Sequence, residues 1–399
     1  MTGTSGVGSY RQLLASSTTR RTYVLSSLGR SAYAMLPLLF LFTVRQASGS
    51  FAVAATAMSL VALTSLSMPV KSRLIDRHGQ RRVLVPFGVG VALALVAATG
   101  MAAAEVTSPA AWWTVAVAQG LLAPPLGPAM RAQWRALAPA STRTAYALDA
   151  VTEEVLWLLG PAVAGLLLAL GHAKHGLLVV PALILVGSFG LAWSPVQGTL
   201  PEAEAGVAAR VLRQPRLWPA LGLMATFGGA SALLFTGVAA RADSLHQPSL
   251  AAVTETVIGV GAVAGGLLWG RARVMGPAKR SVIALLGSWA VLVAISTLVD
   301  LDSWALIALL LAGAAGSPLW VITYEAADRA VKPSARTEAS TWVTTMANLG
   351  GSGGTALAGL LAATNRPTAP VTLAAAIAGS AALLALAATM AHRPGPPSR

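Results

Sequence analysis

Long apolar segments recur along the whole chain, and short polar connections separate them. Each segment contains about 20 residues, the length that a helix needs to cross ~30 Å of hydrocarbon. Lipid offers no partner to backbone polar groups and the segments are continuously apolar, so helices are predicted rather than barrel strands. Twelve membrane-spanning helices are expected, at residues 24–43, 51–70, 83–103, 111–129, 145–170, 177–194, 217–239, 250–270, 281–299, 304–323, 340–363 and 371–391. The fold class is therefore predicted to be an all-α membrane protein.

The basic residues fall almost entirely on one side of these spans. With the N-terminus placed in the cytoplasm, 23 of the 28 Lys and Arg residues lie in the termini and the cytoplasmic connections. Only Arg45, Lys174, Arg241 and Arg366 lie in the outward connections, and Arg30 lies inside the first span. Cytoplasmic loops of membrane proteins are enriched in Lys and Arg. The asymmetry predicts that both termini are cytoplasmic, which requires an even number of spans.

The amino-acid composition further narrows the class of protein. The chain is 55% hydrophobic and only 11% charged, whereas soluble proteins carry about 25% charged residues. The net charge of +14 is spread over short loops on one side, so lipid headgroups are expected as its partners and nucleic acid is not. With no cysteine and no ligand spacing among the histidines, we expect no metal site. No nucleotide-binding loop or catalytic constellation is seen, so neither a cofactor nor an enzyme is expected.

Landmarks of the first half return 193 residues later in the second half. Gly120 recurs as Gly313, Pro125 as Pro318, and Arg143-Thr144 as Arg336-Thr337. This near-constant offset predicts two six-helix halves. The expected organisation is a cytoplasmic tail at 1–22, a first half at 23–194, a cytoplasmic linker at 195–216, a second half at 217–391 and a cytoplasmic tail at 392–399.

A signature-like loop joins the second and third spans. It contains Ser72, Leu74, Asp76, Arg77, Gly79, Arg81 and Arg82. This loop resembles the Gly-x-Leu-x-Asp-Arg-x-Gly-Arg-Arg/Lys signature of the major facilitator superfamily, with Ser72 in place of the first glycine and one residue of slack at Gln80. The resemblance implies a fold of twelve helices in two halves and a gate that an ionic contact of Asp76 closes. The alternative is that this loop has no gating role and that its basic residues only set the orientation of the protein in the membrane.

Two further segments bear on the direction of transport. Residues Leu159 to Gly165, with Gly160, Pro161 and Gly165, are similar to the Gly-Pro-x-x-Gly-Gly signature of drug antiporters in this superfamily. In the fourth span, Gln119-Gly120 matches the end of the antiporter signature Arg-x-x-Gln-Gly, but Ala116 stands where that signature has its arginine. The first match favours efflux, whereas the second puts a proton relay through that arginine in doubt.

Few ionisable residues lie inside the spans, where each costs at least ~2.5–3.5 kcal/mol. Arg30 lies about 10 Å inside the first span. Arg30, Asp149, Glu153 and Glu154 are candidates for proton or ion coupling. Asp149 and Glu153 share one face of the fifth span, and Glu154 points away from it. We expect Arg30 to pair with Asp149 or Glu153, leaving the other carboxylate to carry a proton. The alternative is that Arg30 extends to the interface. Glu255 in the eighth span is a further candidate for proton or ion coupling.

In the superfamily, the first, fourth, seventh and tenth helices line most of the substrate cavity. This resemblance makes side chains on or near those helices candidates for substrate contact, although ordinary helix packing is an equal or stronger alternative for each. The candidates are Tyr33, Met35, Gln119, Phe227 and Trp320, with Asn348 from the eleventh span. Aromatic, methionine and amide groups suit an amphipathic organic substrate.

The sequence therefore predicts a secondary active transporter that works by alternating access. Proton-coupled efflux of a small amphipathic organic compound is the first hypothesis. Uptake of a sugar or other small metabolite by proton symport is the alternative, and a non-transporting receptor or scaffold is a third reading. Arginine outnumbers lysine 24 to 4, which is typical of GC-rich bacterial genomes, so a bacterial cell membrane and a monomer are expected.

Overall fold

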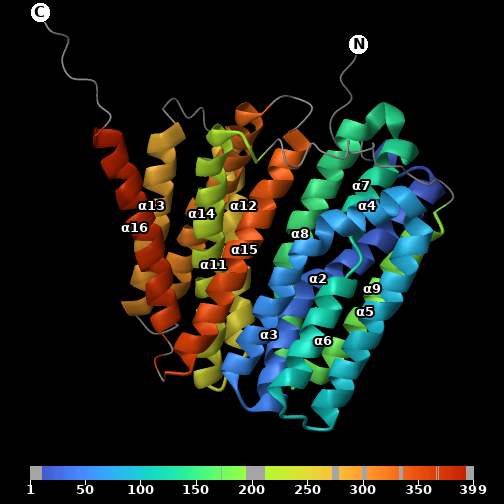
Figure 1. Cartoon of the computed structure of the whole chain (residues 1–399), viewed down its shortest axis with the longest axis horizontal. Helices are drawn as coiled ribbons and strands as arrows, with labels where there is room; N and C mark the ends of the chain where they lie inside the picture. The colour runs from blue at the N-terminus through green and yellow to red at the C-terminus, as the bar shows by residue number, and fades with distance from the viewer. Residues whose placement is uncertain are drawn as a thin grey trace, which may run out of the picture. The chain divides into compact units, whose positions relative to one another are not determined.

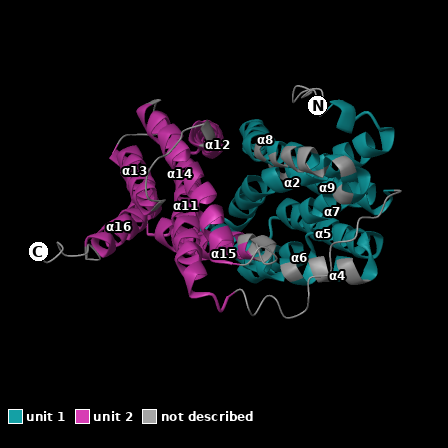
Figure 2. Cartoon of the chain, turned by 90° about the horizontal axis from the view of Figure 1, so that it is seen from above, with its two compact units in different colours: residues 1–204 teal, residues 205–399 magenta. Residues whose placement is uncertain are grey.

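The computed structural model describes residues 11–171, 173–194, 212–271, 278–298, 303–331, 336–364, 366 and 368–391. Every regular element in this part of the chain is helical (Figure 1). The chain divides into two compact units, residues 1–204 and 205–399 (Figure 2). The division falls inside the predicted linker 195–216, of which residues 195–211 lie outside the described part.

Eight α-helices and two short 3-10 turns of the first unit lie wholly within the described residues. They are α2 (Ser17–Ser48), α3 (Phe51–Leu63), η1 (Thr64–Ser67), α4 (Met68–His78), α5 (Gln80–Ala103), α6 (Pro109–Leu122), α7 (Leu126–Leu137), η2 (Pro139–Ser141), α8 (Thr142–Ala169) and α9 (Ala173–Ala192). The second unit contains η3 (Pro215–Leu217), α11 (Trp218–Ser244), α12 (Ser249–Arg271), α13 (Ala278–Leu298), α14 (Ser303–Ala330), α15 (Arg336–Ala362) and α16 (Ala369–Ala391).

The two units repeat the same pattern of helix packing. In the first unit, α2 packs against α8 and α9, α3 against α6, and α5 against α6 and α9. In the second unit, α11 packs against α15 and α16, α12 against α14, and α13 against α14 and α16. Helices in equivalent positions of the chain therefore have equivalent neighbours, which is the packing that an internal duplication produces.

Many large apolar side chains cover the outside of the helices instead of lying in the core. Leu93 is 65% exposed and Leu384 is 72% exposed, as expected for helices whose outer faces contact lipid. Nine helices of the described part are long and apolar enough to cross a membrane. The other three predicted spans correspond to α3–α4, α6–α7 and the more polar α15, so the count of twelve and the orientation of the termini stay predictions.

Two of the predicted spans differ from single regular helices. The predicted span 51–70 consists of α3, the turn η1 and the start of α4, which continues to His78. The predicted span 111–129 is divided into α6 and α7, because Pro124 and Pro125 lack the N–H groups that would continue the helix. Gly120 lies beside η1, where a methyl group would overlap the Thr64 hydroxyl. The irregular parts of both spans therefore meet inside the first unit.

Gly79 joins α4 directly to α5 in a conformation that few other residues adopt. Its φ is 80° and its ψ is 157°, a region almost restricted to glycine. Replacing Gly79 by alanine is therefore expected to destabilise the protein by about 1–3 kcal/mol. Denaturant unfolding of purified protein in detergent measures this loss.

The matched control is Gly100→Ala, because Gly100 is in α5 and a Cβ there would meet no other atom within 4 Å. Replacing a glycine inside a helix by alanine stabilises a protein by about 0.5–1 kcal/mol. The Gly100→Ala variant should therefore be as stable as the wild-type protein or more stable. Equal destabilisation by the two substitutions would show that the backbone at Gly79 is not the cause.

Candidate functional site

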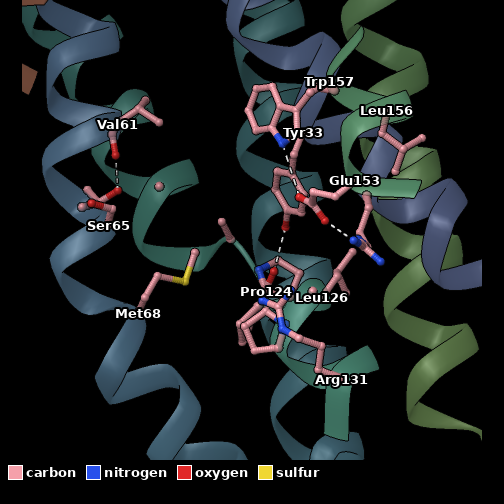
Figure 3. A pocket seen from close by; sticks show the side chains of 18 residues that line it. Tyr33, Val61, Ser65, Met68, Pro124, Leu126, Arg131, Glu153, Leu156 and Trp157 are labelled. Atoms are coloured by element: carbon pink, nitrogen blue, oxygen red, sulfur yellow. Dashed lines mark hydrogen bonds and ion pairs between the residues drawn. The ribbon is translucent and has the colours of Figure 1, made fainter. Parts of the chain in front are cut away.

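The first unit contains a cavity of about 290 Å³ beside the interruption between α6 and α7 (Figure 3). Its walls come from α2, from α3–η1–α4, from the α6–α7 junction and from α8. The lining residues are Arg30, Tyr33, Ala34, Val61, Thr64, Ser65, Met68, Gly120, Ala123, Pro124, Pro125, Leu126, Gly127, Pro128, Arg131, Glu153, Leu156 and Trp157. Small-molecule sites typically measure about 300–1,000 Å³, so this cavity suits a small ligand.

A buried charge cluster forms one side of the cavity. Arg30 donates from one terminal nitrogen to the Asp149 carboxylate at 2.6 Å and from the other to the Glu153 carboxylate. The side chains of Arg30 and Asp149 are only 4% and 3% exposed, whereas Glu153 is 42% exposed. Asp149 also lies 3.6 Å from a guanidinium nitrogen of Arg131. Asp149 is thus enclosed by two arginines, and Glu153 is the carboxylate that is open to the cavity.

This geometry differs from the sequence expectation in one respect. We expected Arg30 to pair with one carboxylate and to leave the other without it, but Arg30 contacts both. The reason is spacing, because side chains four residues apart on α8 lie on the same face and the guanidinium has two terminal nitrogens. Glu153 also accepts a hydrogen bond of 3.3 Å from the Trp157 indole, one turn further along α8 (Figure 3). The proton-carrying role of these residues stays a prediction.

The glycine signature of the fifth span explains why α8 reaches Arg30. At Gly160, the backbone of α8 lies so close to Ala34 of α2 that any side chain there would overlap it. Gly160 follows Glu153 by seven residues, about two helical turns. Close packing at Gly160 therefore holds the two helices together near the ion pairs. Pro161 lies inside α8, and both it and Gly165 are buried.

The opposite side of the cavity is the junction between α6 and α7. Tyr33 lines the cavity and donates a hydrogen bond of 2.9 Å from its hydroxyl to the Pro124 carbonyl (Figure 3). Lys71 donates to the carbonyls of Gly120 and Ala123 at 2.8 and 3.0 Å, and it is only 2% exposed. From the sequence alone, Lys71 is indistinguishable from the other basic residues of the cytoplasmic loop, so it was not among the predicted site residues. A signal was present, since the adjacent Pro124-Pro125 pair in a predicted span frees carbonyls that need donors.

The remaining candidates of the first unit lie outside the cavity lining. Met35 is buried in α2. Gln119 is 2% exposed, and neither atom of its amide has a hydrogen-bond partner among the described residues. Ala116, at the position of the antiporter arginine, is fully buried. Roles of Met35 and Gln119 in substrate contact stay predictions.

The signature-like loop is only partly described. The side chains of Ser72, Asp76, Arg77 and also Glu154 lie outside the described residues, so their predicted roles are untested. In the described part, Leu74 packs against the buried cluster at one end of the unit, which includes Ile75, Leu84 and Trp134. Arg81 lies over the Trp193 ring at 4.6 Å from its centre, and Arg82 is exposed.

The candidates of the second unit are distributed over separate helices. Phe227 is buried in the core of the unit and packs edge-on against Trp289, with ring centres 5.5 Å apart. Trp320 packs against Tyr324 at 5.9 Å, and Asn348 on α15 is exposed. Glu255 on α12 is partly buried, with no hydrogen bond or ion pair to another described residue. Their roles stay predictions.

Apolar spanning helices in two similarly packed units define a multi-pass membrane protein. The Major Facilitator Superfamily family model matches residues 22–271, and the chain belongs to this family. It is therefore a transporter rather than an enzyme. No curated protein matches the chain.

Solved transporters have the same fold. The nucleoside transporter NupG is 14% identical, with a TM-score of 0.72 over 94% of this chain and 99% of that chain. A bacterial homologue of the human lysosomal transporter Spinster is 15% identical, with a TM-score of 0.65 over 99% and 100%. A variant of the E. coli fucose:proton symporter FucP is 16% identical, with a TM-score of 0.57 over 93% and 99%. At these identities, the likeness concerns the fold alone.

Proposed function

We propose that the protein is a proton-coupled exporter of a small amphipathic organic compound and that it works by alternating access in a bacterial cell membrane, with both termini in the cytoplasm. The observation that supports this most directly is the Arg30–Asp149–Glu153 cluster beside the cavity. Ionisable groups within membrane spans are costly and are therefore typical of ion or proton pathways.

The three charges have different parts in this proposal. Asp149, enclosed by Arg30 and Arg131, fixes the position of Arg30. Glu153 is partly open to the cavity and alternates between a carboxylate paired with Arg30 and a neutral acid. The substrate occupies the space beside Glu153, where Trp157, Tyr33 and Met68 offer aromatic and apolar contacts. A substrate and a proton that compete for one site cross the membrane in opposite directions.

Export is favoured over uptake by the glycine and proline signature in α8, which resembles that of drug antiporters and brings α8 onto α2 at Gly160. Proton-coupled uptake is the second candidate. It is favoured by Ala116, because this residue replaces the arginine of the antiporter signature and is fully buried. The FucP relative is named a proton symporter.

The test uses everted membrane vesicles with an inward-acid pH gradient and a fluorescent pH probe. Lipophilic cations, antibiotics and sugars are added in turn, with Asp76→Asn and Glu153→Gln variants alongside. Export predicts that some compounds dissipate the gradient and that both variants lose this response. If no compound dissipates the gradient while whole cells accumulate one of them, the uptake reading replaces export.

A further inference from the structure

A buried lysine joins the helix of the signature-like loop to the cavity wall. Lys71 lies in the first turn of α4, and its ammonium group donates to the carbonyls of Gly120 and Ala123 at 2.8 and 3.0 Å. The residue is only 2% exposed. Burying an ammonium group is costly, so a lysine in this position needs specific partners.

The carbonyl partners of Lys71 lie where the fourth span is interrupted. In a regular helix, the N–H of residue 124 would bond to the carbonyl of Gly120, but Pro124 has no N–H. Pro125 removes the next bond in the same way. Charge-assisted hydrogen bonds from an ammonium group are about twice as strong as neutral ones. Lys71 therefore replaces a helical hydrogen bond that the prolines remove.

The same carbonyl groups belong to the cavity wall. Gly120 and Ala123 line the cavity, as does Met68 at the start of α4, whereas Lys71 itself lies behind the wall. Lys71 therefore acts on the cavity through the backbone of the α6–α7 junction. Its role is to position the wall and not to contact the substrate.

The other end of α4 carries the signature-like loop. Asp76 follows Lys71 by five residues, which is about 8 Å along a helix. α4 runs without interruption from Met68 to His78, Ile75 is 3% exposed in the buried cluster, and Leu74 packs against that cluster. A displacement of α4 at its loop end must therefore move Lys71 and the two carbonyls that it holds.

We propose that Lys71 couples the signature-like loop to the cavity wall, so that gate closure and cavity shape change together. This proposal rests on the proposed function only in taking the cavity as the transport site. A lysine that merely stabilises the fold would leave the effect of a gate substitution on the cavity unchanged.

The test exploits the absence of cysteine from the chain. A single cysteine at Gly127, which lines the cavity and where a Cβ would meet only Arg131 at 3.6 Å, reports the exposure of the wall. Its labelling by a membrane-impermeant maleimide is measured in right-side-out and everted vesicles. The measurement is made with and without the Asp76→Asn substitution in three backgrounds, which are wild-type, Lys71→Met and Lys71→Arg.

We expect Asp76→Asn to change the labelling rate about tenfold in the wild-type background. In the Lys71→Met background this change should fall below about twofold, and Lys71→Arg, which keeps the charge and donors, should restore most of it. Lys279→Met, at an exposed lysine, is the control and should leave the full effect. Melting temperatures are recorded for all variants.

The proposal is overturned if Asp76→Asn changes labelling equally in the Lys71→Met and wild-type backgrounds, whatever the melting temperatures. It is also overturned if Asp76→Asn has no effect with Lys71 present. Should Lys71→Met not fold, Lys71→Gln takes its place, and an undiminished Asp76 effect in that background contradicts the proposal. The assay needs neither substrate nor proton gradient, so its failure would leave the proposed function standing.

Discussion

Replacing Arg30 by methionine is expected to destabilise the protein by about 3–5 kcal/mol and to abolish transport. Asp149 is 3% exposed, and its closer partner is Arg30 at 2.6 Å. Without that partner, the Arg131 contact at 3.6 Å is the one ion pair that the buried carboxylate keeps among the described residues. Glu153 would also lose the cation that fixes its position in the cavity. Denaturant unfolding in detergent and vesicle transport measure the two effects.

A second substitution separates the lost charge balance from lost packing. Adding Asp149→Asn to Arg30→Met removes the unpaired buried charge, so the double variant should be more stable than the single one by about 1–3 kcal/mol. The control is Arg20→Met on the same helix, because Arg20 is exposed and its side chain donates to the Leu14 carbonyl at 3.4 Å. Similar losses in Arg20→Met and Arg30→Met would contradict a special role for the buried cluster.

The second large effect concerns Glu153. Replacing Glu153 by glutamine is expected to reduce proton-driven transport at least about 100-fold while substrate exchange without a gradient continues. Arg30 and Trp157 donate to different oxygens of the Glu153 carboxylate, so the single amide oxygen of glutamine keeps one of these hydrogen bonds, and glutamine cannot take up or release a proton near neutral pH. Gradient-driven uptake into vesicles and substrate counterflow are measured on the same preparation.

The matched control is Glu325→Gln, which removes a 60% exposed carboxylate paired with Arg329 at the surface. An exposed pair four residues apart is worth only about 0.3–0.5 kcal/mol, so both assays should remain at the wild-type level. If Glu153→Gln keeps gradient-driven transport, the proton site lies elsewhere, and Glu255 is the next carboxylate to replace.

Much of the fold could be predicted because its signals are local. A run of about 20 apolar residues indicates a membrane span, whatever the rest of the chain contains. Their boundaries were less predictable where spans are irregular. The prolines at 124 and 125 divide the fourth span, and the turn η1 interrupts the second, so the helical segments end at other residues than hydropathy alone suggests.

The candidate site was predictable only in part. Arg30, Asp149 and Glu153 stood out because charged residues are rare in apolar segments. Their geometry depends on α2 and α8 being neighbours, which the close approach at Gly160 permits. Lys71 was missed because a lysine beside a basic loop resembles a topogenic charge, and only its burial distinguishes it.

The sequence by itself determined that the chain is helical and membrane-spanning and which few charges lie within its apolar segments, since each of these depends on composition within short windows. The internal repeat was visible from landmarks 193 residues apart. The tertiary structure decided which of those groups meet. Arg30 is 119 residues from Asp149, Lys71 is 49 residues from Gly120, and Tyr33 is 91 residues from Pro124. Contacts over such separations follow from how helices pack. Packing depends on small residues and interrupted helices, and a local sequence pattern does not show which other helix each of them contacts.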